Sequence, residues 1–258
     1  MRNPFEVPLR PDQAALFFLG QAGYALRSCG RTVVIDPYLS DSVGKIAPDF
    51  SRIVPVPVAP DAFKADIFIV THDHLDHLDP ETVSAYAFKD DTRFVAPRLA
   101  VKKLILLGVP RENITRVDAG ESVAIEGIRI TGVYAVPTEA AVIDTTGYWI
   151  EFPNSRNFYH TSDTAFSQVL LDGAPKAQVL LTCINGKWGN LSIKEAAELA
   201  LKTNPQYAIP NHYDMMALNS EDPENFRKIM AGMGSPSRVI VPEIMRAYLF
   251  GEDGVVEM

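Results

Sequence analysis

The amino-acid sequence predicts an α+β fold, a sandwich of two facing mixed β-sheets with helices on the outer faces. Strand-like segments outnumber helical segments along the chain, and the two kinds alternate in its last third. The 258 residues suffice for one large core, and 47% apolar with 22% charged residues is typical of a globular protein. We expect one domain, residues 1–258, without a linker or an internal repeat.

The first third of the chain is predicted to form strands. Ala14–Gly20, Gly23–Ser28 and Arg31–Pro37 are apolar segments separated by glycine and proline. Residues 40–60 are rich in proline, which favours an extended, irregular loop over a helix. Ala65–His72 is a continuous apolar run ended by polar residues, which is typical of a strand buried on both faces.

Two helices should follow that buried strand. The first begins with Asp79 as N-cap and Pro80 at the first helical position, and the second spans Ala96–Gly108, ended by its glycine. Strands then return, and a hairpin is indicated where Glu126 and Gly127 separate two alternating apolar segments. These predicted strands are Asn113–Val117, Ser122–Gly127, Ile128–Val136, Thr146–Phe152 and Arg156–Asp163.

The last third alternates between strand and helix. The strand-like segments are Ala177–Ile184 and Gln206–His212, and the helical ones are Ser192–Thr203 and Asp222–Gly234. Ser192 with Glu195 three residues later forms a capping-box signature at the start of a helix.

Charge and composition limit the partners. The formal net charge is −8, and no run of basic residues interrupts it, so nucleic acid is not expected as a partner. No apolar run is long enough for a bilayer, and the N-terminus lacks the apolar stretch of a signal peptide. Two cysteines cannot form a disulfide framework in a chain of this length. We expect a cytoplasmic protein with a small-molecule substrate and no membrane contact; homo-oligomerisation stays open.

The stretch "THDHLDH" at residues 71–77 holds three of the five histidines of the chain. At the end of an extended strand, His72 and His74 point to the same side, and Asp76 and His77 follow in the turn. Imidazole nitrogen and carboxylate oxygen are good ligands for zinc, manganese or iron. The spacing therefore predicts a metal site in a loop after a strand.

Further ligands must come from elsewhere in the chain. Asp163 and His212 each follow an apolar strand, as the histidine cluster does. The alternatives are a helix N-cap for Asp163 and an ordinary loop histidine for His212. His160 has the alternative of a strand-end histidine with a satisfied hydrogen bond, and we do not count it as a ligand.

These motifs resemble the metallo-β-lactamase superfamily. "THDHLDH" is followed by "HTSDT" and "IPNHYD", and "LGQAGYALRS", "VVIDPYLSD" and "NLSIKEAAELA" are similar to the branch that includes the L-ascorbate-6-phosphate lactonases. The resemblance covers about Ala15 to Pro223. It implies two facing sheets with metals at one edge. It implies that His72 and His74 bind a first metal, that Asp76, His77 and His212 bind a second, and that Asp163 bridges the two.

One departure from the superfamily pattern concerns the first metal. The superfamily usually supplies a third histidine for it, but this chain has no histidine between His77 and His160. Glu139 and Asp144 are the nearest carboxylates that could replace it, and both could equally be loop charges. We expect one well-held divalent cation, Zn or Mn, and a second that is partly occupied or absent.

The chemistry expected from these residues is hydrolysis by metal-activated water. A bound divalent cation lowers the pKa of its water toward neutrality, with Asp76 and Asp163 as the catalytic carboxylates. No GxSxG nucleophile motif is present. We expect a small anionic lactone or ester as substrate; the alternatives are a phosphodiesterase or nuclease on the same fold, and a metal-binding protein without turnover. Lys187 and the loop to Asn190 could hold an anionic group, although a plain turn is the better interpretation.

Overall fold

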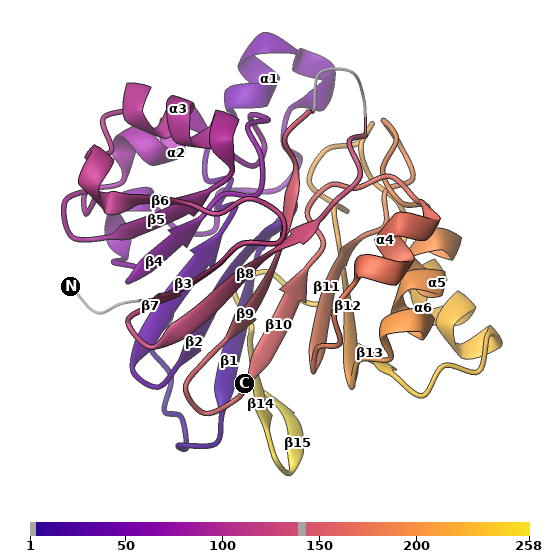
Figure 1. Ribbon diagram of the computed structural model, residues 1–258. Helices are drawn as coiled ribbons and strands as arrows, with labels where there is room; N and C mark the ends of the chain where they lie inside the picture. The colour runs from indigo at the N-terminus through magenta and orange to yellow at the C-terminus, as the bar shows by residue number, and fades with distance from the viewer. Residues whose placement is uncertain (1–3, 139–142) are drawn as a thin grey trace.

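Two mixed β-sheets face each other in the computed structural model, which describes residues 4–138 and 143–258 (Figure 1). The first sheet has the strand order β15-β14-β1-β2-β3-β4-β5-β6. Its strands β1 to β3 pair antiparallel and β3 to β6 pair parallel. The strands are β1 (Ala14–Gly20), β2 (Gly23–Ser28), β3 (Arg31–Ile35), β4 (Ile67–Ile69), β5 (Arg93–Ala96), β6 (Ile114–Arg116), β14 (Ala247–Gly251) and β15 (Gly254–Glu257).

The second sheet has the order β13-β12-β11-β10-β9-β8-β7. Its antiparallel half runs from β7 to β10 and its parallel half from β10 to β13. The strands are β7 (Ser122–Ile125), β8 (Ile128–Tyr134), β9 (Thr146–Glu151), β10 (Asn157–His160), β11 (Val179–Cys183), β12 (Tyr207–Asn211) and β13 (Arg238–Val239). Two mixed sheets with outer helices confirm the predicted fold class.

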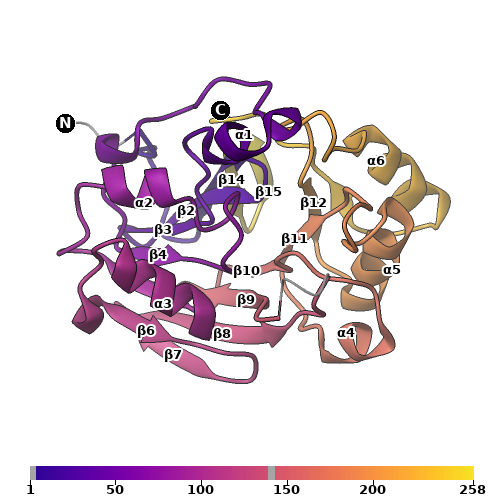
Figure 2. The ribbon, with the colours of Figure 1, turned by 90° about the horizontal axis from the view of Figure 1, so that it is seen from above.

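Helices cover the two outer faces (Figure 2). On one side lie α2 (Pro80–Ala85) and α3 (Arg98–Leu106), and on the other α4 (Gln168–Gly173), α5 (Ile193–Thr203) and α6 (Pro223–Gly232). The short α1 (Ser42–Ile46) lies at the upper edge in Figure 1. Single 3₁₀ turns complete the set at Pro48–Phe50, Pro60–Ala62 and Arg111–Asn113.

The strands bury both faces, as the alternation in β1 illustrates. Leu16 and Phe18 belong to the core between the sheets, whereas Ala15, Phe17 and Leu19 pack under the outer helices. Because successive side chains of a strand point to opposite faces, a strand buried on both sides needs a continuous apolar sequence. At roughly 25 cal/mol per Å² of apolar surface, burial on both faces is the main term that holds the two halves together.

Several local signals in the sequence are confirmed. The side chain of Asp79 accepts a hydrogen bond from the Glu81 amide at the start of α2. Ser192 and Glu195 form the reciprocal capping box of α5. Glu126 and Gly127 both have positive φ, 52° and 81°, as a two-residue hairpin turn between β7 and β8 requires.

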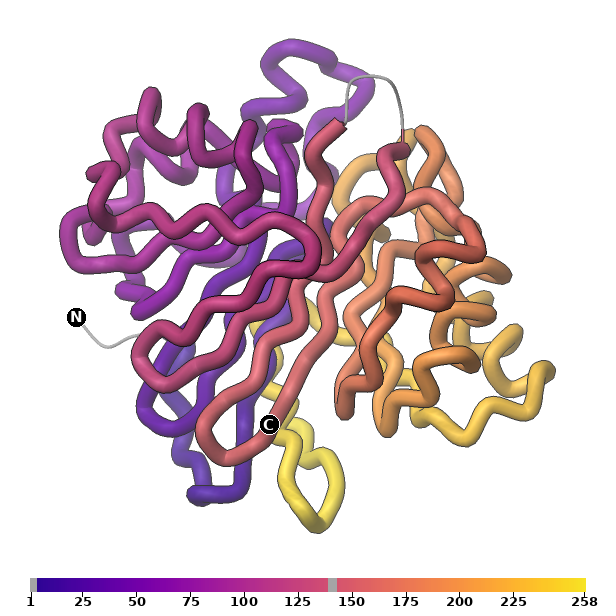
Figure 3. The backbone as a smooth tube through the Cα atoms, in the orientation of Figure 1, coloured from indigo at the N-terminus to yellow at the C-terminus, as the bar shows by residue number. Residues whose placement is uncertain are grey.

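The prediction of an irregular segment at residues 40–60 is wrong in part. Residues 42–46 form α1, because the prolines of this region, from Pro48 onward, lie outside that helix. The sequence pattern predicts no element for the C-terminal residues, but they form a hairpin, β14–β15, that returns to pair with β1 in the first sheet (Figure 3). In the described part of the chain, no helix has both the length and the apolar character needed to cross a membrane.

Candidate metal centre

The structure brings all six predicted ligands together at the edge where β4, β10 and β12 end. They form two groups, and within each the potential ligand atoms lie within 4.8 Å of one another. We call them the His72 group (His72, His74 and Asp163) and the His77 group (Asp76, His77 and His212).

Asp163 lies between the two groups. Its Oδ1 atom is 3.4 Å from His77 Nε2 and 3.3 Å from His212 Nε2, although it belongs to the His72 group. Asp76 Oδ2 is 3.8 Å and 3.6 Å from the same two nitrogens. A single carboxylate therefore contacts both groups, in the position that a bridging ligand would occupy.

Three potential ligand atoms at this centre are buried and have no hydrogen-bond partner among the described residues. They are His72 Nε2, His77 Nε2 and Asp163 Oδ1. Leaving one such atom unsatisfied costs about 1–3 kcal/mol, so native structures rarely do it. Divalent cations held by the two groups would satisfy all three, and the mixed imidazole and carboxylate donor set suits zinc or manganese.

The orientation of His77 is fixed by Asp36, a fully buried residue that follows β3. Asp36 Oδ2 lies 2.7 Å from His77 Nδ1 and also accepts a hydrogen bond of 2.6 Å from Thr71 Oγ1, while Asp36 Oδ1 accepts one of 2.8 Å from the Thr71 amide. Asp36 thus keeps a proton on Nδ1 of His77, so that Nε2 faces the centre and would give up its own proton to ligate a cation. A carboxylate behind a metal-binding histidine is the usual arrangement in metalloproteins.

His72 is also oriented through its Nδ1 atom, but by hydroxyl groups and not by a carboxylate. Its Nδ1 atom is 3.0 Å from Thr71 Oγ1 and 3.4 Å from Ser162 Oγ. Since Thr71 already donates its hydroxyl proton to Asp36, it accepts from His72, and Nε2 is again left for a ligand.

The electrostatics of the centre favour a cation. Burial and then the neighbouring charge of His77 lower the pKa of His72 well below its usual value, so this imidazole is neutral. For Asp163, burial acts to raise the pKa, but His212 and His77 outweigh it and hold the pKa well below the usual range. For His77, burial acts to lower the pKa, and the carboxylates of Asp163, Asp76 and Asp36 outweigh it and raise the pKa well above its usual value. Three carboxylates around one imidazole create a negative potential that a divalent cation would neutralise.

Sequence reasoning missed two further polar partners, Gln21 and Asn190. Gln21 Nε2 donates to Asp76 Oδ2 at 2.8 Å and lies 3.2 Å and 3.3 Å from the two ring nitrogens of His212. Asn190 Nδ2 donates to Asp163 Oδ2 at 2.9 Å, which leaves Oδ1 facing the imidazoles. The only signal for Gln21 was its place directly after a strand, the same signal that identified Asp163 and His212.

Four residues of the centre adopt left-handed backbone conformations. The φ values are 54° for Gln21, 42° for Asp36, 63° for Ser162 and 66° for His212. A residue other than glycine in this region costs on the order of 1–3 kcal/mol, and such residues cluster at functional sites. The His212 amide donates a hydrogen bond to Gln21 O at 2.7 Å, which helps to stabilise this strained conformation.

The remaining candidates have structural roles. His160 Nε2 donates to Ala22 O at 2.9 Å, and its Nδ1 accepts from the Ser162 amide at 3.0 Å, so both ring nitrogens are occupied. The Leu99 amide donates to Asp144 at the start of α3, so Asp144 stabilises a helix end and belongs to neither group. Glu139 lies outside the described residues. Asp163 is no helix cap, because α4 begins later and is capped by Ser167.

A cavity of about 350 Å³ opens beside both groups. His74, Asp76 and Asp163 form one side of it, and Asn190, Asn219 and Thr138 add polar atoms. The rest of its lining is apolar and consists of Val43, Phe50, Trp188 and Met216. The predicted anion-holding role of Lys187 is not supported, because its Nζ donates to Ser220 O at 2.9 Å and does not line the cavity.

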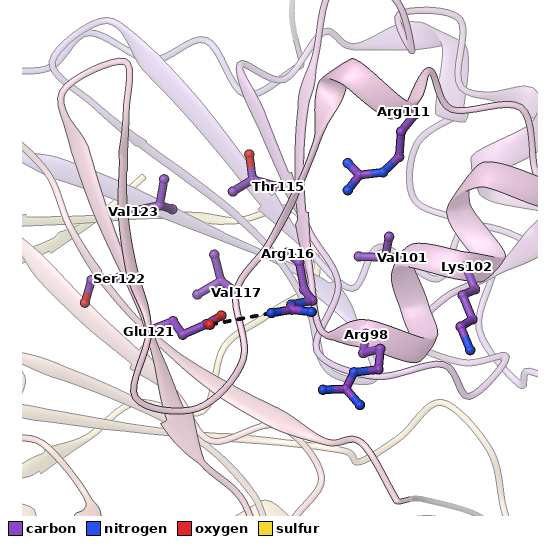
Figure 4. A pocket seen from close by; sticks show the side chains of 10 residues that line it. All are labelled: Arg98, Val101, Lys102, Arg111, Thr115, Arg116, Val117, Glu121, Ser122 and Val123. Carbon is purple, nitrogen blue, oxygen red and sulfur yellow. Dashed lines mark ion pairs between the residues drawn. The ribbon is translucent and has the colours of Figure 1, made fainter.

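A second, larger groove of about 700 Å³ lies between α3, β6 and β7 and contains no histidine (Figure 4). Its lining includes four cations, Arg98, Lys102, Arg111 and Arg116. A local basic patch thus exists that the sequence did not indicate, because it is assembled from separate segments. Arg116 is paired with Asp118 and Glu121, at 3.2 Å and 3.7 Å.

Comparisons with known proteins agree with this geometry. Residues 31–213 match the family model described as the beta-lactamase superfamily domain. A UPF0173 metal-dependent hydrolase of Caldivirga maquilingensis is 30% identical over 233 residues, which is 88% of this chain and 93% of the relative. A UPF0173 protein of Pyrococcus furiosus is 26% identical over 83% of this chain and 89% of its own length.

Solved structures extend the likeness to the fold. Igni18, described as a novel metallo hydrolase from Ignicoccus hospitalis, superimposes with a TM-score of 0.74 at 20% identity over 92% of this chain and 98% of that one. An isothiocyanate hydrolase from Delia radicum gut bacteria gives a TM-score of 0.73 at 16% identity over 90% and 97%. The chain belongs to the UPF0173 family of metal-dependent hydrolases within the metallo-β-lactamase superfamily.

Proposed function

We propose that this protein hydrolyses a small ester or lactone with water activated at the candidate metal centre. The observation that carries the proposal is the pair of ligand groups that share Asp163 and leave three buried ligand atoms without partners. The lactone expectation comes from the sequence resemblance to the L-ascorbate-6-phosphate lactonases, and the family relatives are named only as metal-dependent hydrolases.

The proposed ligands are the six residues of the two groups, and zinc or manganese is the proposed ion. A bound divalent cation would lower the pKa of its water and polarise the substrate carbonyl. Asp163 would orient that water through Oδ1, because Asn190 already occupies its Oδ2. Asp76, held by Gln21, would take the proton of the water and return it to the leaving oxygen.

The proposed reaction balances without a further reactant. The water oxygen forms a bond to the acyl carbon, the acyl carbon–oxygen bond of the ester breaks, and the leaving alkoxide takes a proton. An ester yields a carboxylate and an alcohol, and a lactone yields both groups on one molecule. Phosphodiester hydrolysis remains the alternative reaction on the same centre, but no cation lines the cavity among the described residues to hold a second phosphate oxygen.

Metal analysis followed by substrate panels would test this function. The protein should hold stoichiometric Zn or Mn, hydrolyse members of an ester and lactone panel, lose this activity with chelator and recover it when the metal is added back. Turnover of phosphodiesters alone would favour the alternative enzyme. Stoichiometric metal with no hydrolysis of any panel would favour metal binding without turnover.

A further inference from the structure

The cavity beside the metal centre divides into a reactive side and an apolar side. The reactive side holds the ligands His74, Asp76 and Asp163. The apolar side consists of Val43, Phe50, Trp188 and Met216, which come from three separate segments of the chain. At about 350 Å³ the cavity is at the small end of the range for small-molecule sites, so a substrate that reaches the reactive side must also touch the apolar side.

Trp188 is the least expected member of that apolar side. Its side chain is 52% exposed, and its backbone has a φ of 56°, which is unfavourable for a bulky residue. The indole ring lies 5.7 Å from the Phe50 ring at 55°. Because Trp188 is half-exposed, the free energy gained by burying it does not offset its backbone strain. We therefore infer that this side chain binds a ligand.

The loop that carries Trp188 is fixed in place by its next residue. Gly189 has a φ of 87°, and a Cβ atom there would lie 2.2 Å from Thr138 O, so only glycine fits. The turn is closed by the Asn190 amide, which donates to Lys187 O at 2.9 Å. Trp188 is therefore held toward the cavity by the same turn that places Asn190 on Asp163.

The rest of the apolar side is also built as a unit. Tyr38, Met215 and Met216 form a small buried cluster, against which Val43 and Phe50 pack, separate from the two large cores. The Ile53 amide donates to Met215 O at 2.8 Å, which joins the segment after Phe50 to the segment that carries Met216. The apolar side is thus preformed in the structure.

The cations nearest in sequence to the apolar lining residues are paired elsewhere and do not line the cavity. Lys45, two residues after Val43, pairs with Glu81 at 2.6 Å. Arg52, two residues after Phe50, donates to the carbonyl oxygens of Tyr38, Ser40 and Val54 at 2.8–2.9 Å. Lys187, which precedes Trp188, donates to Ser220 O. Within the described lining, an anionic substituent would find no cationic partner. Away from the ligands it would meet only the neutral polar side chains of Thr138, Asn190 and Asn219 and the four apolar ones, where an unpaired charge is costly.

We propose that the part of the substrate beyond the scissile bond is uncharged and apolar, an aryl or branched alkyl group packed against the Phe50–Trp188 pair. This inference rests on the proposed hydrolytic function, and it replaces the anionic substrate expected from the sequence with an apolar ester or lactone. Phe50 and Trp188 are specificity-determining residues that contact the substrate away from the reacting atoms.

A matched pair of esters tests the inference with the metal-loaded protein. Benzyl acetate and 4-carboxybenzyl acetate share the same reacting bond and differ by one charge. We expect kcat/KM to be at least about tenfold higher for benzyl acetate, and Trp188→Ala and Phe50→Ala to remove most of that preference through KM. Val169→Ala, at a side chain that is 62% exposed on α4, is the control and should keep the preference.

Two kinetic results would overturn the inference. One is equal or faster hydrolysis of the charged ester, and the other is a preference that survives both aromatic substitutions. If neither ester is hydrolysed, the proposed function loses support. The inference about the apolar side is then tested by a separate measurement of ligand binding. The Trp149→Phe variant keeps Trp188 as its only tryptophan, so its fluorescence reports on Trp188 alone. Saturable quenching of that fluorescence by benzyl alcohol would support the apolar site. The quenching should be absent when Phe50→Ala is added to Trp149→Phe. No quenching in the Trp149→Phe variant itself would refute the apolar site.

Discussion

The His77 group and the His72 group use the same kinds of ligand atoms but differ in how firmly those atoms are held. In the His77 group, His77 is oriented by the buried carboxylate of Asp36, and Asp76 is held by Gln21. In the His72 group, the Nδ1 atom of His72 has only hydroxyl groups as hydrogen-bond partners. The ring of His74 is half-buried and makes no hydrogen bond within the described residues.

This difference indicates that the His77 group is better preorganised for an ion than the His72 group. Ligands that are fixed before binding lose less conformational entropy when the ion arrives, and a carboxylate behind an imidazole raises its basicity. The His77 group should therefore hold its ion more tightly than the His72 group. This agrees with the missing third histidine noted in the sequence, since each group has two imidazoles but the only carboxylate of the His72 group, Asp163, also contacts His77 and His212.

The largest effect should come from deleting a ligand of the firmly held group. His77→Ala and His212→Ala should each remove the bound metal and lower kcat/KM by more than the roughly 10- to 100-fold expected for loss of an outer partner. His74→Ala should leave about one metal per chain, measured by elemental analysis. If His74→Ala loses all metal while His212→Ala keeps it, the order of the two groups is reversed.

A smaller loss should follow from Asp36→Asn, which keeps the shape of the side chain but removes its charge behind His77. Metal affinity should fall by roughly 10- to 100-fold, measured by competition with a chromophoric chelator. Asp61→Asn, at an exposed position in a 3₁₀ turn, is the matched control and should bind metal as the native protein does. Unchanged affinity in Asp36→Asn would mean that the orientation of His77 does not set the difference between the groups.

His160→Ala should affect stability and leave both groups intact. Losing the two hydrogen bonds of this buried imidazole should lower the free energy of unfolding by about 2 kcal/mol, measured by urea denaturation. Metal content should stay the same as in the native protein. A His160→Ala protein that folds but lacks one ion would make this histidine part of the His72 group.

The smallest effect is expected for Asp144→Ala. Loss of its hydrogen bond to the Leu99 amide at the start of α3 should cost about 1 kcal/mol of stability, with metal content unchanged. Loss of the ion from the His72 group in this variant would show that Asp144 substitutes for the absent histidine after all.

The sequence predicted the six clustered residues because the signal is local. Three histidines at close spacing after an apolar run identify a strand end, and Asp163 and His212 repeat that pattern. Asp36 and Gln21 could not be predicted in the same way, because their roles depend on contacts 41 and 55 residues away along the chain.

Elements of the fold were likewise predicted where the sequence carries a clear local signal. Helices with capping residues, such as α2 and α5, were predicted close to their observed bounds, because a cap is a local signal. The short strands β5 and β13 were missed, because four and two residues carry too little periodicity. The helix α4 was missed although Ser167 caps it, because that cap was not recognised in the sequence. The basic groove was missed because tertiary structure alone gathers its arginines.

The pairing of β14 with β1 constrains the order in which the molecule can be made. Ala14 lies opposite Phe250, so β1 gains its outer neighbour only after residue 250 has been synthesised. During translation the apolar β1 would present an open edge, which is a template for pairing with other nascent chains. The β14–β15 hairpin therefore covers the open edge of β1 once it has been synthesised. Ribosome-bound chains that end before residue 247 should depend on chaperones.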